Sequence, residues 1–157
     1  MMVSNQAKII LTKDGFFKIK TKLKSLEEVE RKKVADDMRD AQSFGDIAEN
    51  SEFEEARTRQ ELLEQEIAEL KHILSQAIIV SPQNSRGKIT IGSKVKVRTD
   101  HKTEVYEIVG DREANPQEYK ISYRSPWGQA MLGKAKGEKV EVFTPRGPKI
   151  LHILEIS

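Results

Sequence analysis

Apolar residues recur along residues 53–77 of this chain at alternating spacings of three and four. This spacing is typical of a helix that packs one seam of side chains against a partner helix. The seam consists of Phe53, Ala56, Gln60, Leu63, Ile67, Leu70, Leu74 and Ala77, with Gln60 as its one polar member. The segment therefore predicts a long helix that requires a second helix beside it.

The partner helix is expected immediately upstream. Thr12 is a suitable N-cap for a helix that starts near Lys13. The apolar seam of this helix consists of Phe16, Ile19, Leu23 and Leu26, followed by Val34, Met38 and Ala41. The register slips between these two groups, and such a slip locally changes the supercoiling of paired helices.

The helical pattern breaks in residues 44–50, which read Phe-Gly-Asp-Ile-Ala-Glu-Asn. Gly45 readily takes a positive φ and Asn50 tolerates it, so the segment suits a tight reversal. Two helices joined by so short a connection are expected to lie antiparallel. A helix of roughly 28 residues is about 40 Å long. The loop, with its carboxylates Asp46 and Glu49, would then form the far tip of a rod.

A polar segment at residues 81–87 marks a domain boundary, so we expect domains at residues 1–81 and 82–157. Beyond it the apolar period changes to two, which predicts strands. The predicted strands are 89–91, 95–97, 105–109, 119–123, 140–143 and 150–156. Ser125 as N-cap and Pro126 as first helical residue predict one short helix. The expected fold class is α+β, with an N-terminal antiparallel coiled-coil hairpin and a small, mostly antiparallel sheet with one short helix.

Composition and motifs exclude several classes of function. The chain has no cysteine, which excludes disulfides, zinc–thiolate sites and thiol nucleophiles and suits a reducing cytoplasm. No stretch approaches the roughly 18 apolar residues of a membrane span, and residues 1–8 lack the apolar core of a signal peptide. Glycine-rich phosphate loops and the HExxH metal motif are absent. We therefore expect a cytoplasmic protein without membrane contact and without a conventional active site.

Charge is distributed unevenly along the chain. Residues 1–82 hold 13 basic and 16 acidic residues, whereas the remainder holds 14 and 9. Within the predicted rod, residues 8–33 are mostly basic, and residues 36–55 contain eight acidic residues against Arg39 alone. A rod that is basic at its root and acidic at its tip can be steered onto a charged partner. An ordinary solvated helix surface explains the same pattern.

The two carboxylates of the predicted tip are candidates for metal binding. Asp46 and Glu49 lie three residues apart on a tight loop, so both can reach one point beyond it. Mg²⁺ prefers oxygen ligands and is usually held by one or two carboxylates, with water or phosphate completing its shell. Two carboxylates cannot form a complete site, but they can complete one in another protein. Alternatively, Asp46 or Asn50 simply caps the second helix, and Glu49 and Glu52 complement its dipole.

Residues 43–53, followed by the pair Ala56-Arg57, resemble the tip signature of the bacterial Gre transcript-cleavage factors of the GreA type. The similarity covers nearly the whole chain in order and at family-like spacing. Its further segments are Leu11-Thr12 with Gly15, Gly87 through Val95, Ile108-Val109-Gly110, Ile121-Ser122, Ser125-Pro126 with Gly128, Leu132-Gly133, and Thr144-Pro145 with Gly147.

The resemblance implies an N-terminal coiled coil and an FKBP-like C-terminal domain. In this family the C-terminal domain docks at the rim of the RNA polymerase secondary channel, and the coiled coil reaches down that channel. Asp46 and Glu49 would help hold a second Mg²⁺ jointly with the polymerase, which cleaves the 3′ end of backtracked RNA. The implied protein is a transcription elongation factor that rescues arrested complexes. It is not itself an enzyme, and it stimulates the RNA-cleavage activity of the polymerase.

The resemblance also implies partners and contact residues. The expected partners are bacterial RNA polymerase and the 3′ end of nascent RNA, with DNA contacted only indirectly, and the protein is expected to be a monomer. Arg57 is the expected RNA contact, although Gln42 stands where relatives often have a basic residue. Ser125 and Pro126 are the expected polymerase-docking residues. For prolyl isomerase activity, Trp127, Phe143 and three tyrosines form no recognisable pocket set in the sequence.

Two alternatives to the cleavage factor remain open. The first is a Gre-like inhibitor that occupies the channel without stimulating cleavage, although the intact spacing of Asp46, Glu49 and Asn50 favours the activator. The second is a coiled-coil adaptor or chaperone-like protein whose tip is only a capped turn. Capture of RNA polymerase by this protein distinguishes the second alternative from the other two functions, since an adaptor or chaperone-like protein does not require polymerase binding.

Overall fold

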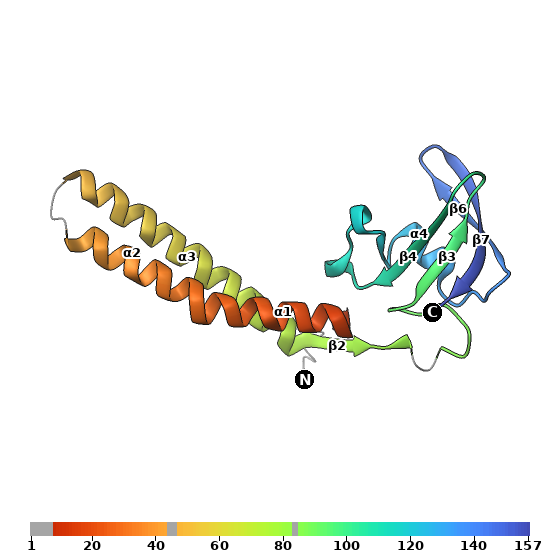
Figure 1. Ribbon diagram of the computed structural model, residues 1–157, viewed down its shortest axis with the longest axis horizontal. Coiled ribbons are helices and arrows are strands. Elements are labelled where there is room, and N and C mark those ends of the chain that lie inside the picture. The colour runs from red at the N-terminus through yellow and green to blue at the C-terminus, as the bar shows by residue number, and fades with distance from the viewer. Residues whose placement is uncertain (1–7, 44–46, 83–84) are drawn as a thin grey trace, which may run out of the picture. The chain divides into compact units, whose positions relative to one another are not determined.

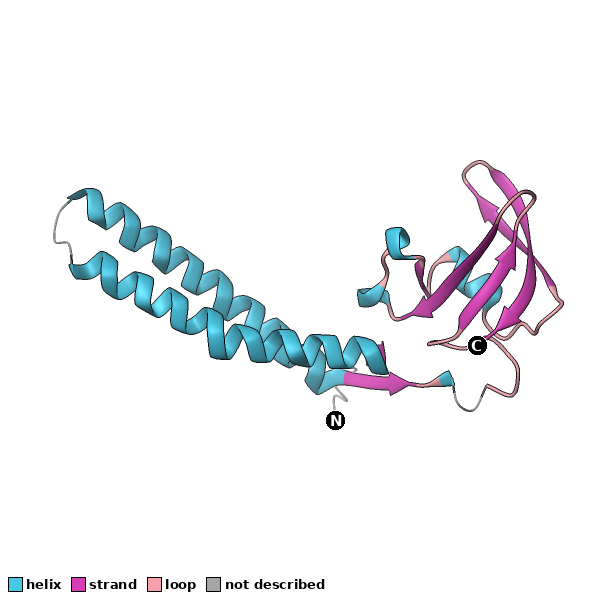
Figure 2. Ribbon diagram, viewed as in Figure 1, coloured by secondary structure: helices cyan, strands magenta, loops and turns pink. Residues whose placement is uncertain are grey.

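The computed structural model describes residues 8–43, 47–82 and 85–157, and the side chains of residues 47–50 are not described. Residues Phe16–Gln76 form one compact unit. The described residues up to Gly15, together with Ala77–Ser157, form the other. Figure 2 shows that the first unit is helical and that the second contains the strands.

The helical unit is a pair of antiparallel arms (Figure 1). The first arm comprises α1 (Lys13–Ser25), a π-helical turn η1 (Leu26–Glu30) and α2 (Arg31–Ser43), and the second is the 30-residue helix α3 (Ile47–Gln76). Arg31 of α2 contacts Glu64 of α3, and Asp37 contacts Arg59. The later residue of α2 therefore contacts the earlier residue of α3. The two helices run antiparallel, which confirms the predicted hairpin.

The seam between the arms follows the predicted pattern with two corrections. Its buried core consists of Val34, Leu63 and Ile67, against which Leu23, Leu26 and Met38 pack. Burial of each large aliphatic side chain contributes about 1.5–3 kcal/mol. Gln60 is exposed and does not join this core. Ala77 lies outside the helix, because α3 ends at Gln76 and a strand begins there.

The π-helical turn absorbs the predicted register slip. The N–H of Arg31 donates to the carbonyl of Leu26, five residues earlier. A regular heptad would place seam residues at positions 30 and 33 after Leu26, whereas Val34 is the buried residue. Because a π turn accommodates one additional residue, the seam faces α3 on both sides of the slip.

A short parallel sheet belongs to the second unit. Strand β1 (Ile9–Thr12) pairs with β2 (Ala77–Val80), with Ile9 opposite Ala77 and Thr12 opposite Val80. The sequence analysis did not predict this pair. Each strand is only four residues long, which is too short for a period of two to be distinguished from the helical pattern beside it.

The larger sheet has five strands in the order β5-β4-β3-β7-β6 (Figure 2). The strands are β3 (Lys94–Arg98), β4 (Thr103–Val109), β5 (Lys120–Ser122), β6 (Lys139–Thr144) and β7 (Gly147–Ile156). All neighbouring pairs are antiparallel except β4 and β5, which are parallel. The sheet is therefore mostly antiparallel, as predicted, and the 3₁₀ turns η3 (Asp111–Glu113) and η4 (Pro116–Glu118) return the chain for the one parallel strand, β5.

The core of this unit lies between the sheet and helix α4 (Pro126–Met131). It consists of Ile89, Val95, Val97, Ile108, Met131, Val140, Val142, Leu151 and Ile153. The predicted strand at residues 89–91 is wrong, although Ile89 is buried. A turn occupies this segment, in which the N–H of Thr90 donates to Oγ of Ser93 at 3.0 Å and Gly92 has a φ of 93°.

Thr12 caps α1 as predicted, since the N–H of Gly15 donates to its Oγ1 at 3.1 Å. Thr12 is also held by Glu113 of η3. The N–H of Thr12 donates to the Glu113 carboxylate at 2.9 Å, and its hydroxyl donates to the other oxygen. The N–H of Gly110 donates to the same carboxylate at 3.2 Å. Glu113 thus fastens β1 to the segment that follows β4.

Candidate functional site

The structure describes neither side chain of the two carboxylates predicted for the tip. Asp46 lies outside the described residues, and Glu49 lies in the first turn of α3 without a described side chain. Within residues 8–43, 47–82 and 85–157, no group of three or more acidic or histidine side chains is arranged to hold a metal ion. The metal-binding role of the tip therefore stays a prediction.

The described residues that flank residues 44–50 are acidic and solvent-exposed. Asp40 lies in the last turn of α2, and Glu52, Glu54 and Glu55 lie near the start of α3. On α2, Arg39 is close to Asp36, with its nitrogen 3.7 Å from the carboxylate. This end of the hairpin presents a negative surface, which favours a positively charged or metal-containing partner.

The two arginines near this end differ in their contacts. Arg59 donates to Asp37 across the hairpin at 3.0 Å. Arg57, the predicted RNA contact, lies 3.6 Å from Glu61 within its own helix, and its side chain is 57% exposed. Because an exposed pair at this distance is weak, the Arg57 guanidinium can exchange Glu61 for another anion. Arg59 is tied into the hairpin itself.

The predicted docking residues lie at the start of α4. Oγ of Ser125 accepts the N–H of Gly128 at 3.1 Å and donates to the carbonyl of Ser122 at 2.7 Å. Ser125 is thus the N-cap of α4, as predicted, and it ties the helix to the end of β5. Pro126 follows it and is exposed. The two hydrogen bonds of Ser125 therefore fix the start of α4, where Pro126 is exposed to solvent.

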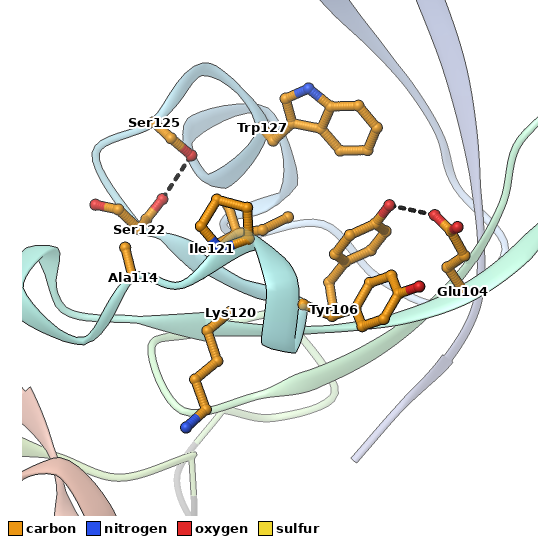
Figure 3. Close-up of a pocket in the computed structure, with 10 residues that line it drawn as sticks. Glu104, Tyr106, Ala114, Lys120, Ile121, Ser122, Ser125 and Trp127 are labelled. Carbon is orange, nitrogen blue, oxygen red and sulfur yellow. Dashed lines mark hydrogen bonds between the residues drawn. The ribbon is translucent and has the colours of Figure 1, made fainter.

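Ser125 also lines a pocket of about 480 Å³ in the sheet unit (Figure 3). The pocket is lined by Glu104, Tyr106, Ala114, Pro116, Tyr119, Lys120, Ile121, Ser122, Ser125 and Trp127. The Tyr106 ring lies 5.7 Å from that of Tyr119 and 5.6 Å from that of Trp127, between centroids. Burial, followed by the hydrogen bond to Glu104, raises the pKa of Tyr106 above its usual 10.0.

This pocket was not predicted from the sequence. Trp127 packs partly buried against the core and also lines the pocket. Tyr106 and Tyr119 were not recognised as its neighbours. The distinguishing feature of Tyr119 is visible only in the structure. Its φ is 57°, and the chain turns there from η4 into β5.

Comparison with known proteins gives matches over both parts of the chain. The family model described as "Transcription elongation factor, N-terminal" matches residues 9–79, and "Transcription elongation factor, GreA/GreB, C-term" matches residues 83–157. No helix in the described parts of the chain has both the length and the apolar character needed to cross a membrane.

Individual relatives extend over nearly the whole length. The transcription elongation factor GreA of Chloroflexus aggregans is 46% identical over 149 residues, which cover 93% of this chain and 95% of that protein. The protein of the same name from Acetivibrio thermocellus is 41% identical over 159 residues, which cover 99% of each. Among solved structures, GreA factor homolog 1 of Thermus thermophilus covers 96% of this chain and 99% of its own, at 26% identity and a TM-score of 0.44.

Proposed function

Because the chain belongs to the GreA/GreB family of transcription elongation factors, we propose that it stimulates RNA cleavage by backtracked RNA polymerase. The hairpin would enter the secondary channel of the polymerase, and the sheet unit would dock at its rim. The chain would not catalyse the cleavage itself. The RNA 3′ end would be cleaved by the polymerase, and the chain would supply groups that the polymerase site lacks.

The observation that carries this proposal is the two-helix arm. Helix α3 alone has 30 residues, which corresponds to about 45 Å. The buried seam and the ion pairs between the two helices hold the hairpin together as a rod that could reach into a narrow channel. The described end of the hairpin is acidic. A long hairpin whose described end is acidic is suited to completing a site in another protein.

The tip carboxylates fit a Mg²⁺ ion by their chemistry. Asp46 and Glu49 supply hard oxygen donors, which Mg²⁺ prefers, and two such donors are the number that a shared site requires. A bound Mg²⁺ would lower the pKa of a water molecule and so provide a nucleophile. The residues of this chain would position the carboxylates, while Asp40, Glu52, Glu54 and Glu55 would raise the local negative potential that attracts cations.

Arg57 is the residue of this end that we assign to the RNA. Its guanidinium is exposed and only weakly paired with Glu61, so an RNA phosphate can replace that carboxylate and gain bidentate hydrogen bonds. Arg59 is assigned a structural role, because its bond to Asp37 joins the two arms. Loss of Arg57 should therefore weaken RNA positioning, and loss of Arg59 should loosen the hairpin.

Docking is assigned to Ser125 and Pro126. Ser125 fixes the start of α4 through two hydrogen bonds, and Pro126 is exposed beside the aromatic pocket. A rigid, exposed proline next to an aromatic pocket is a suitable contact for a protein surface, because the proline loses little conformational freedom on binding.

A cleavage assay on a stalled, backtracked elongation complex tests the proposal. Addition of this protein with Mg²⁺ should release short fragments from the RNA 3′ end and restore elongation. The protein without polymerase should leave the RNA intact. If the protein binds polymerase but slows both cleavage and synthesis, it is an inhibitor, and if it does not bind polymerase at all, the adaptor alternative is favoured.

A further inference from the structure

Strands β6 and β7 extend beyond the rest of the sheet. His152 of β7 has register partners in both β3 and β6, whereas the first residues of β7, Gly147 to Leu151, pair with β6 alone. Residues 139–151 therefore form a two-stranded ribbon, called here the β-arm, which is the blue hairpin at the upper end of the sheet in Figure 1. Five residues of overhang correspond to about 17 Å.

The β-arm is basic, and one cation of β3, Arg98, lies near its base. The β-arm contains Lys139, Arg146 and Lys149 against the single acidic residue Glu141. Arg98 lies beside Lys139 across β7, since His152 is the register partner of both. These four cations are solvent-exposed, and none of them makes an ion pair with any part of the chain that the structure describes. Their charge is therefore available to a polyanion.

The β-arm also exposes apolar side chains, on the face that carries Lys139 and not on the face of Lys149, whose register partner is the buried Val142. Phe143 is 74% exposed and Ile150 is 51% exposed. Lys139, Glu141 and Phe143 alternate with the buried Val140 and Val142, so they share the outward face of β6. An uncovered aromatic ring on the same face of a sheet as unpaired cations, here Lys139 and Arg98, is a combination by which proteins hold single-stranded nucleic acid, with bases stacking on the ring.

The end of the β-arm is conformationally restricted. The hydroxyl of Thr144 donates to the carbonyl of Gly147 at 2.7 Å across the turn. Gly147 has a φ of 112°, which favours glycine, and Pro145 and Pro148 on either side have φ fixed by their rings. The cations and the ring are therefore presented with little freedom left to lose on binding.

We propose that the β-arm binds single-stranded nucleic acid. Arg98, Lys139 and Arg146 contact backbone phosphates, and Phe143 stacks on a base. An acidic protein surface would match the cations but would leave the Phe143 ring without a planar partner, so a nucleic-acid strand fits the surface better. This inference concerns the sheet unit alone and does not rest on the hairpin or on RNA cleavage.

Binding of a labelled 12-nucleotide RNA to the full chain, followed by fluorescence anisotropy over a salt series, tests the proposal. The variant Lys139→Ser/Arg146→Ser should weaken binding about ten-fold at low salt. It should also reduce the slope of log affinity against log salt by about 1.4, since each phosphate contact contributes roughly 0.7 on single strands. Phe143→Ser should weaken binding by a similar factor, whereas Phe143→Tyr should retain it because its ring still stacks.

The matched control removes two exposed lysines from α1, in the variant Lys18→Ser/Lys24→Ser, and should bind nearly as well as the parent chain. Equal losses in the two double variants would overturn the proposal, because binding would then follow net charge alone. Absence of binding at low salt, or tighter binding of duplex DNA than of RNA or DNA single strands, would also overturn it. Circular dichroism melting confirms folding, and the single variants Lys139→Ser and Arg146→Ser replace the double variant should it unfold.

Discussion

A β-carbon at Gly15 would lie 2.0 Å from Oε1 of Glu113. The Glu113 carboxylate cannot simply move aside, because it accepts hydrogen bonds from Thr12 and Gly110. The first turn of α1 and the η3 turn therefore approach so closely that only glycine fits between them. This contact ties the first strand of the chain to a segment about a hundred residues later, as the Thr12–Glu113 separation of 101 shows.

Gly15→Ala should destabilise the protein. In most helices this change stabilises by roughly 0.5–1 kcal/mol, but here the methyl group would displace Glu113 and break its hydrogen bonds, each worth about 0.5–1.5 kcal/mol. We expect a net loss of about 1–2 kcal/mol in urea unfolding. In a Glu113→Ala background the same change should become neutral or stabilising. An increase in stability from Gly15→Ala alone would contradict the contact.

The Arg31–Glu64 pair should give the hairpin an acid-sensitive component of stability. Arg31 donates two hydrogen bonds of 2.7 Å to Glu64, and these lower the pKa of Glu64 below its usual 4.5. A carboxyl group with a lowered folded-state pKa stabilises above its ordinary pKa and loses that contribution as pH falls through the folded value. The melting temperatures of the parent and of Glu64→Gln should therefore converge below about pH 4.5.

The control for this pH series is Glu61→Gln, which removes a carboxylate that lies 3.6 Å from Arg57. At neutral pH its melting temperature should lie closer to that of the parent chain than the melting temperature of Glu64→Gln does. A constant difference between parent and Glu64→Gln from neutral pH to acid would mean that the Arg31 pair does not couple to folding.

Asp46→Asn and Glu49→Gln should each reduce stimulated RNA cleavage at least ten-fold. They remove charge with little change in size, and loss of one placed electrostatic group costs roughly 10²–10³ in comparable sites. Polymerase binding should change little, and added Mg²⁺ should partly restore cleavage. Glu28→Gln, which removes an exposed acid of η1, is the control and should leave cleavage unchanged. If the carboxylates are only caps, cleavage survives and the hairpin loses about 1 kcal/mol.

Pro126→Arg should weaken polymerase binding while stability stays within about 1 kcal/mol, because Pro126 is exposed. Thr103→Arg, which adds the same charge at the exposed start of β4, should bind as the parent chain does. A pull-down with purified polymerase measures both. Unchanged binding of Pro126→Arg would remove the docking assignment.

The hairpin was predictable because its pattern is long. Eight seam positions set the period of α3, and only Gln60 and Ala77 depart from it. The caps of α1 and α4 were predictable for the opposite reason, since Thr12 and Ser125 act on N–H groups three residues away. Strands β1 and β2 were missed because four residues carry too little periodicity.

Contacts between distant segments were beyond sequence reasoning. Tyr106, Tyr119 and Trp127 come from β4, the end of η4 and α4, and only the fold brings them to one pocket. In the same way, the Asp37–Arg59 bond depends on the register of the two arms. For the tip, the sequence remains the source of the assignment, because Asp46 lies outside the described residues.

The π-helical turn at Leu26–Glu30 separates two properties of the hairpin that are usually linked. Each residue turns an α-helix by about 100°, so without the turn Val34 and Met38 would rotate away from α3. Seven residues added to both arms would lengthen the hairpin by about 10 Å without rotating its end. One residue gained or lost at the turn would instead change the azimuth of everything beyond it. Reach and aim can therefore vary independently, the first by whole heptads and the second by a single residue.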